Sequence, residues 1–117
     1  MSFYVDGFVL PLPKSHVDRY QKISKACQAI WKEYGAIDYV ECLADDVKSG
    51  EINSFPQSVI LKEDETVVFA WITYKSREDR DRCNEKVMAD PRLKDLMDKD
   101  LFDGKRMIFG GFKTIVQ

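Results

Sequence analysis

Two acidic residues that interrupt apolar segments of this 117-residue chain are the first candidates for chemistry. Asp6 stands between Val5 and Gly7, and Glu41 directly precedes Cys42. A carboxylate held in an apolar cavity has a raised pKa, which suits it to act as a general base. For Asp6 we favour the alternative of a structural ion pair or a rim carboxylate, because structural networks also bury charges. For Glu41 the favoured alternative is an edge-strand side chain in water.

Three further residues could complete a small-molecule site with these carboxylates. Arg106 could pair with Asp6, as could Lys105 or the backbone amides near Gly110-Gly111, because in the strand order argued below the last strand lies beside the first. Trp71 could stack on a flat substrate, although such residues more often belong to a core or an interface. Asn84 could donate a hydrogen bond into a cavity or only stabilise its helix. The candidate ligand site therefore comprises Asp6, Glu41, Trp71, Asn84 and Arg106.

Several classes of site are not expected from the residue inventory. His16 is the single histidine, so neither a histidine-based triad nor a multi-histidine metal site can form within one protomer. The sequence holds no GxGxxG, Walker or GxSxG motif. The net charge of -2 shows no basic surplus of the kind that phosphate backbones attract. We therefore expect no metal, no cofactor and no nucleic-acid partner.

The expected location is the cytoplasm. No apolar run approaches the roughly 20 residues of a membrane helix, and Asp6 and Gly7 interrupt the first apolar segment before a signal-peptide core could form. The three cysteines are odd in number and form no CxxC pair, which fits a reducing compartment. No membrane association is expected.

The apolar patterns predict four strands and two main helices. Strands are expected over residues 3–12, 36–44, 66–74 and 106–116, and helices over 14–34 and 76–89, with a short helix over 92–99. Pro11 and Pro13 are expected to close the first strand, Ser15 to cap the first helix, and Gly35 to end it. Residues 45–58 read as a long polar arm, with an edge strand possible over 59–61.

This order predicts one α+β domain over residues 1–117, ferredoxin-like β-α-β-β-α-β, with a four-stranded antiparallel sheet and helices on one face. In the segment 66–74 both parities are apolar, with Val67, Phe69 and Trp71 on one and Val68, Ala70 and Ile72 on the other. A monomer would expose one such face, so we expect a homodimer through the sheet faces. The alternative is that the arm or the C-terminus covers the sheet.

Several stretches resemble the YbaA-like family of small bacterial proteins, a domain-of-unknown-function group in the dimeric α/β barrel superfamily. They are residues 4–9, 41–42 with 45–47, 68–72, 84–92 and 102–112, and the run Asp103-Gly104-Lys105-Arg106-Met107-Ile108 is the most specific. The resemblance implies the ferredoxin-like fold and a dimer with the sheets face to face. It implies no established activity, since the wider superfamily spans monooxygenases, haem-degrading enzymes and ligand-binding or stress proteins.

Two functional hypotheses follow. The first is a non-enzymatic dimeric module in binding or stress response, in which the polar strand residues are structural. The second is a cofactor-independent, monooxygenase-like enzyme with a closed pocket beside Asp6, using Arg106 and Trp71. We favour the first as a description of the protein.

Overall fold

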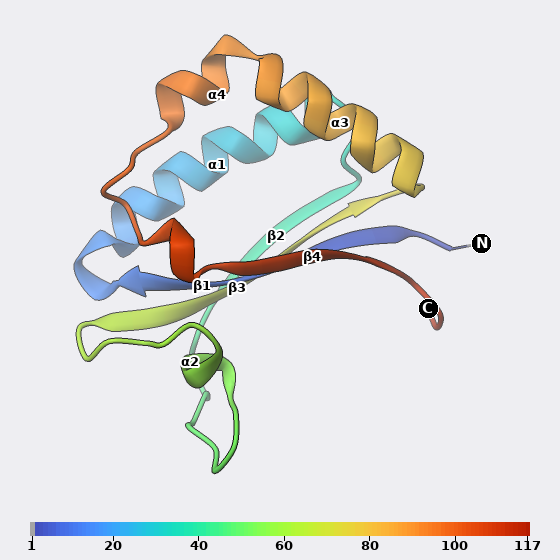
Figure 1. Cartoon of the computed structure of the whole chain (residues 1–117). Coiled ribbons are helices and arrows are strands. Elements are labelled where there is room, and N and C mark those ends of the chain that lie inside the picture. The colour runs from blue at the N-terminus through green and yellow to red at the C-terminus, as the bar shows by residue number, and fades with distance from the viewer. Residues whose placement is uncertain (1) are drawn as a thin grey trace.

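The computed structural model describes residues 2–117 and has two layers (Figure 1). Strands β1 (Tyr4–Pro13), β2 (Asp38–Leu43), β3 (Glu65–Tyr74) and β4 (Ile108–Lys113) form one antiparallel sheet in the order β2-β3-β1-β4. Helices α1 (Val17–Glu33), α3 (Arg77–Ala89) and α4 (Pro91–Leu96) cover one face, and α2 (Phe55–Ser58) lies beyond the other. The predicted α+β fold of ferredoxin-like order is confirmed.

The expectation that Pro11 and Pro13 close β1 is half right. Pro13 is the last residue of β1, whereas Pro11 lies inside the strand, and both pair with β3. Pairing with β4 stops at Val9, opposite Ile108, so beyond that point β1 is an edge strand. A proline is tolerated there because its missing N–H need not serve a second neighbour.

The first helix starts later than predicted. Residues Lys14–His16 form a 3-10 turn, and α1 begins at Val17 without a side-chain cap, so the assignment of Ser15 as the cap was wrong. Gly35 ends the helix with a φ of 117°, in the left-handed region that favours glycine. In the described part of the chain, no helix combines the length and the apolar character needed to cross a membrane.

The remaining helix ends follow the sequence closely. Ser76 caps α3, its Oγ accepting from the Asp79 amide at 3.1 Å. Asp90 ends α3 and caps α4, accepting from the Arg92 amide at 2.8 Å. Its Oδ2 also accepts from the Tyr34 hydroxyl at 2.7 Å, which ties the end of α1 to the α3–α4 corner. Hydrogen bonds from Arg92 and Tyr34 hold the pKa of Asp90 well below its ordinary value.

Alternation along the strands divides the apolar residues between two faces. The even-numbered residues of β1 and β3 face the helices, where Leu10, Leu12, Val68, Ile72 and Tyr74 are buried. The odd-numbered residues face the other way. Of these, Val9 and Val67 pack against Val59 of the arm, residues 44–64.

A buried ion pair, which we call the latch, joins Arg106 in the turn before β4 to Glu65 at the start of β3, and Arg106 also contacts the arm. Arg106 donates to the two carboxylate oxygens of Glu65, at 2.8 and 2.6 Å, and to the Ile60 carbonyl at 2.9 Å. The side chains of Arg106 and Glu65 are 12% and 6% exposed. The suggested pairing of Arg106 with Asp6 was therefore wrong. The suggested edge strand over 59–61 does not form, because Val59 is buried after α2 and Ile60 has a φ of 50°.

Removing the latch arginine should destabilise the fold strongly. Arg106→Met leaves the Glu65 carboxylate buried without its partner, which should lower the free energy of unfolding by about 3–5 kcal/mol. Urea denaturation measures this. The matched control is Arg77→Met, because Arg77 is exposed and its contact with Asp81 is long, at 3.9 Å; we expect a change within about 0.5 kcal/mol.

The contribution of the latch to the free energy of unfolding should also depend on pH. Hydrogen bonds from Arg106 lower the pKa of Glu65 in the folded protein. Its contribution to stability is therefore complete above the ordinary glutamate pKa and is lost as the pH falls through the lowered value. Equal unfolding free energies for Arg106→Met and Arg77→Met would contradict this role for the latch.

Candidate functional site

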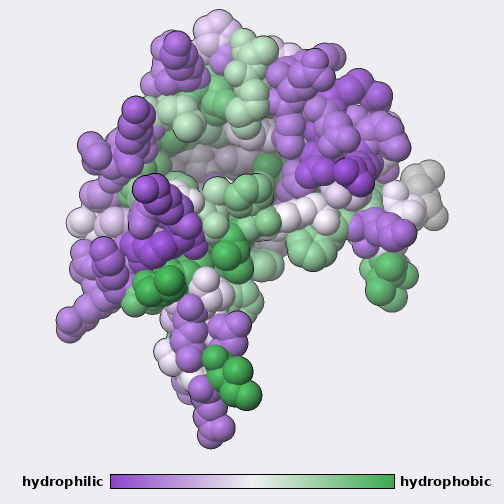
Figure 2. Space-filling view, viewed as in Figure 1, coloured by the Kyte–Doolittle hydropathy of each residue, from purple (hydrophilic) through white to green (hydrophobic). Residues whose placement is uncertain are grey.

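A cavity of about 530 Å³ lies between the helix-facing side of the sheet and the helices. Figure 2 shows the surface hollowed between these two layers. Helices α1 and α4 and the segment that follows α4 form its walls. The lining is mainly apolar and includes Phe8, Leu10, Ile23, Cys27, Trp31, Ala70, Met88, Leu93, Leu96, Met97, Phe102 and Met107.

The floor of the cavity follows from the register of the sheet. Phe109 of β4, Phe8 of β1, Ala70 of β3 and Glu41 of β2 are successive cross-strand partners, so they form one row on the helix-facing side. The rings of Phe8 and Phe109 stack with centroids 6.3 Å apart. Ala70 carries the smallest side chain of the row. It therefore leaves space above the sheet directly beside the Glu41 carboxylate.

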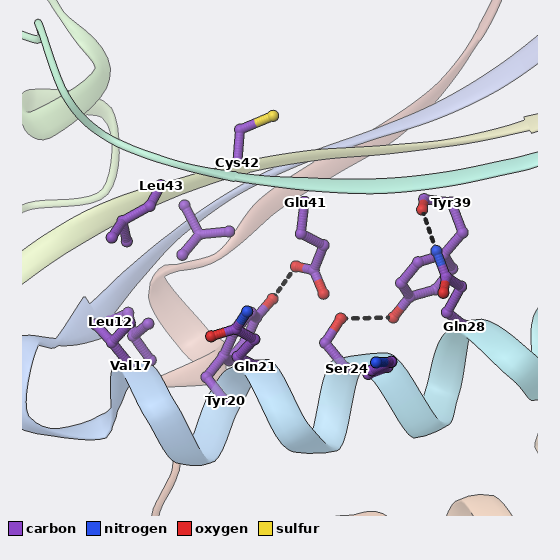
Figure 3. A pocket seen from close by; sticks show the side chains of 12 residues that line it. Leu12, Val17, Tyr20, Gln21, Ser24, Gln28, Tyr39, Glu41, Cys42 and Leu43 are labelled. Atoms are coloured by element: carbon purple, nitrogen blue, oxygen red, sulfur yellow. Dashed lines mark hydrogen bonds between the residues drawn. The ribbon is translucent and has the colours of Figure 1, made fainter.

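Polar side chains from α1 meet Glu41 and Tyr39 of β2 at one wall of the cavity. Figure 3 shows them from the smaller cavity that adjoins this wall. The Tyr20 hydroxyl donates to Glu41 Oε1, and the hydroxyl oxygens of Ser24 and Tyr39 are 3.1 Å apart. Gln28 donates to the Tyr39 carbonyl at 2.9 Å. Residues 20, 24 and 28 are spaced by four, so α1 presents them on one face towards β2.

A second cavity of about 450 Å³ lies on the other side of this polar wall, between α1 and the edge strand β2. The two cavities share Tyr20, Ser24, Tyr39 and Glu41 as lining residues. The smaller cavity also carries Gln21, Lys25 and Gln28 and is more polar. We call the four shared residues the polar wall. It separates an apolar space from one that is partly polar.

Burial dominates the electrostatics of the polar wall. It raises the pKa of Glu41, while the hydrogen bonds from Tyr20 and Tyr39 act in the opposite direction. Burial and the nearby Glu41 also raise the pKa of Tyr20 and of Tyr39, so both phenols remain proton donors. Within residues 2–117, no lysine or arginine forms an ion pair with Glu41. β2 is an edge strand, as the sequence predicts, but Glu41 is half-buried against α1, so the expectation that its side chain lies in water was wrong.

Asp6 belongs to a different cluster. Its Oδ1 accepts from Arg80 at 2.7 Å, and the Arg80 guanidinium lies 4.8 Å from the centre of the Tyr4 ring. Burial raises the pKa of Asp6, although Arg80 and Asn84 counteract this. Asp6 borders neither of the two cavities. It is an ion-paired residue, as favoured from the sequence, but its partner is Arg80.

The structure thus separates the five predicted site residues into three places. Asp6 and Asn84 lie together near Tyr74, whose hydroxyl is 3.4 Å from Asn84 Oδ1. Glu41 lies in the polar wall, and Arg106 belongs to the latch. Trp71 borders the larger cavity, but it alternates with the buried Ala70 and Ile72, and its ring lies 5.7 Å from that of Phe69 on the opposite face.

Tyr20, Ser24 and Tyr39 were not recognised as site residues from the sequence. Tyr20 matches the apolar period of α1, which predicts a core residue. The signal that could have identified it is the pair Ser24 and Gln28, polar residues one and two turns later on the same face. Among residues 2–117, no three His, Cys, Asp or Glu side chains are grouped so that they could hold a metal ion.

Neutralising Glu41 should stabilise the protein at high pH. The folded-state pKa of Glu41 is raised, so the group destabilises the fold as the pH rises above the ordinary glutamate pKa. Glu41→Gln keeps an acceptor for Tyr20 and removes the charge. We expect its melting temperature at pH 8 to exceed that of the wild type by about 2–5 °C, and the difference to shrink towards pH 4.

Glu51→Gln, on the exposed arm, is the matched control and should leave the melting curve unchanged. A Glu41→Gln variant less stable than the wild type at pH 8 would show that the carboxylate contributes net stability, contrary to this account.

The fold matches solved structures whose sequences are distant. A NIPSNAP family protein of unknown function from Agrobacterium tumefaciens superimposes with a TM-score of 0.60 at 16% identity, over 96% of this chain and 87% of that one. A protein from an uncultured marine organism, described as dimeric and ferredoxin-like, gives a TM-score of 0.58 at 11% identity, over 100% and 91%. At these identities the similarity establishes the fold alone.

The sequence comparisons are much closer. The uncharacterized protein YbaA of Escherichia coli K12 is 46% identical over 113 residues, which is 97% of each chain, and that of Shigella flexneri matches equally well. The predicted resemblance is confirmed. The model of the protein family of unknown function DUF1428 matches residues 3–104. This chain belongs to the DUF1428 family.

Proposed function

We propose that the protein is a non-enzymatic, homodimeric module that binds a small molecule in the larger cavity. The observation that carries the proposal is the pairing of an apolar cavity of about 530 Å³ with a single polar wall. Ligand sites have this composition: they measure roughly 300–1,000 Å³ and combine an apolar lining with a few polar groups that fix orientation. The polar wall supplies hydroxyl donors and a carboxylate acceptor at one end of such a site.

The alternative is a cofactor-independent enzyme with Asp6 as its base. It has less support, because the Asp6 carboxylate is paired with Arg80 and borders neither cavity. A general base must reach the proton that it removes. For Asp6, the Arg80 guanidinium already binds Oδ1 at 2.7 Å, and neither cavity brings a substrate to the carboxylate.

The cavity can be tested by filling it. Ala70→Leu adds a larger side chain to the floor beside Glu41. We expect it to weaken the binding of octanol, a small apolar probe with one hydroxyl, by at least about tenfold, which corresponds to about 1.4 kcal/mol. Isothermal titration calorimetry measures this. The control is Ala89→Leu at the exposed end of α3, which should bind octanol like the wild type. Undiminished binding by Ala70→Leu would place the probe elsewhere.

The face of the sheet opposite the helices supports the homodimer. Phe69, Ile108 and Phe112 are 43%, 46% and 64% exposed, and we call this apolar surface the open face. The arm covers Val9 and Val67, and its Phe55 packs edge-on against Phe69 with ring centroids 5.8 Å apart, but Phe69 stays partly exposed and Ile108 and Phe112 are uncovered. A second copy related by a twofold axis would bury the open face of both protomers.

Glycines keep part of the open face flat. Gly7 and Gly110 are cross-strand partners in an uninterrupted register, so the sheet has no bulge there. The Phe112 ring lies beside them, 3.8 and 3.7 Å from where a Cβ would stand on Gly7 and Gly110. Two solved relatives in fold are described as dimeric ferredoxin-like proteins, which supports the same assembly.

The dimer should dissociate when a charge is placed on the open face. Phe112→Glu is expected to elute as a monomer, because pairing would bury two like charges. Ala89→Glu, on the helical layer, is the control and should remain dimeric. Native mass spectrometry and light scattering report the subunit number, and a monomeric wild type would contradict the proposal.

The free cysteines support a reducing compartment such as the cytoplasm. Cys27, Cys42 and Cys83 carry free thiols, and Cys42 is exposed at the edge strand β2. An exposed free thiol persists more readily where disulfides do not form.

A further inference from the structure

We infer that the larger cavity takes an organic cation: an amphipathic amine whose protonated nitrogen lies against Glu41 and whose apolar body fills the space above Ala70. The inference rests on the proposed function, because it assigns the ligand class of the same cavity. It is carried by three features of the described residues: an unpaired carboxylate, the aromatic rings around it, and the apolar opening.

The charged residues of the lining leave one carboxylate without a cation. They are Glu41, Asp98 and Lys99, and the exposed Lys99 forms no ion pair with Glu41. Asp98 pairs with Arg19 at 3.1 Å, whereas Glu41 has no cationic partner among residues 2–117. A carboxylate withdrawn from water without a counter-charge is costly, and an incoming ammonium group relieves that cost. A neutral ligand would leave the charge unbalanced, and an anionic one would add repulsion.

Aromatic rings flank the carboxylate on both sides. Tyr20 donates to Glu41 and packs edge-on against Phe102, with ring centroids 6.1 Å apart. Tyr39 packs against Trp31 at 5.8 Å. All four rings line the larger cavity. The faces of aromatic rings attract cations, most strongly where water is excluded, and rings around an acidic group are typical of ammonium recognition.

The opening of the cavity suits an apolar body of variable shape. Met88 of α3 and Met97, directly after α4, line the cavity and are largely exposed. Methionine is flexible and polarisable, so it adapts to irregular apolar ligands. Phe109 is also exposed and stacks on Phe8 at the β4 end of the floor. An alkyl or aryl group can therefore extend from Glu41 across the floor towards these residues.

A matched series of probes tests the ligand class. Octylamine, octanol and octanoate share one chain and differ in the charge of the head group. At pH 7.5 we expect octylamine, which is then protonated, to bind the wild type at least about tenfold more tightly than octanol, and octanoate to bind most weakly. Calorimetry at low ionic strength measures all three.

The carboxylate is tested by substitution. Glu41→Gln should remove the preference for octylamine while keeping octanol binding within about twofold, and Glu51→Gln should keep the preference. Because the comparison of probes is also made on the wild type, it does not depend on how the variant folds. If octanol or octanoate binds the wild type as tightly as octylamine, the cation assignment is wrong and the cavity proposal stands. If none of the three binds, both fail.

The pH dependence gives a further check. Octylamine binding should weaken as the pH falls and Glu41 becomes protonated, whereas octanol binding should change little. The other titratable groups around the site are Tyr20, Lys25 and Cys27 on α1, Tyr39 on β2, and Asp98 and Lys99 after α4. If octylamine binding to Glu41→Gln still weakens as the pH falls, one of these other groups causes the pH dependence. That result would contradict the role of Glu41.

Discussion

Because side chains alternate along each strand, the antiparallel register of β1 with β3 sends Phe8 and Ala70 towards the helices and Gly7 and Trp71 towards the opposite face. Both faces are therefore apolar, and each requires a cover. The helices cover one face incompletely and leave a cavity above Ala70. The other face keeps exposed phenylalanines that a second copy can bury. The cavity and the open face thus follow from one constraint on the sheet.

Glu41 differs from the two other carboxylates discussed above, because it has no cationic partner among residues 2–117. The latch and the Asp6–Arg80 pair give their carboxylates a cation within 2.7 Å. Glu41 instead has hydroxyl donors and an aromatic surround, and burial raises its pKa. Natural sequences keep such locally unfavourable groups mainly where function requires them. The contrast among the three carboxylates supports Glu41, rather than Asp6, as the centre of a binding site.

The sequence was sufficient to predict the order of the elements, the ends of α3 and the apolar character of both sheet faces, because these depend on local pattern. It was not sufficient to pair distant charges. Arg106 and Glu65 are 41 residues apart, and Asp6 and Arg80 are 74 apart, so their contacts depend on how the layers pack. Glu41 was misjudged because the apolar pattern of β2 is short and does not show which parity faces α1.

A crystal structure of the protein grown with octylamine tests the central claim most directly. The account predicts density for the alkyl chain above Ala70 in the larger cavity, with its nitrogen within about 3 Å of a Glu41 carboxylate oxygen. An amine bound only on the open face of the sheet, or a larger cavity that stays without ligand density while octylamine binds in solution, would contradict it.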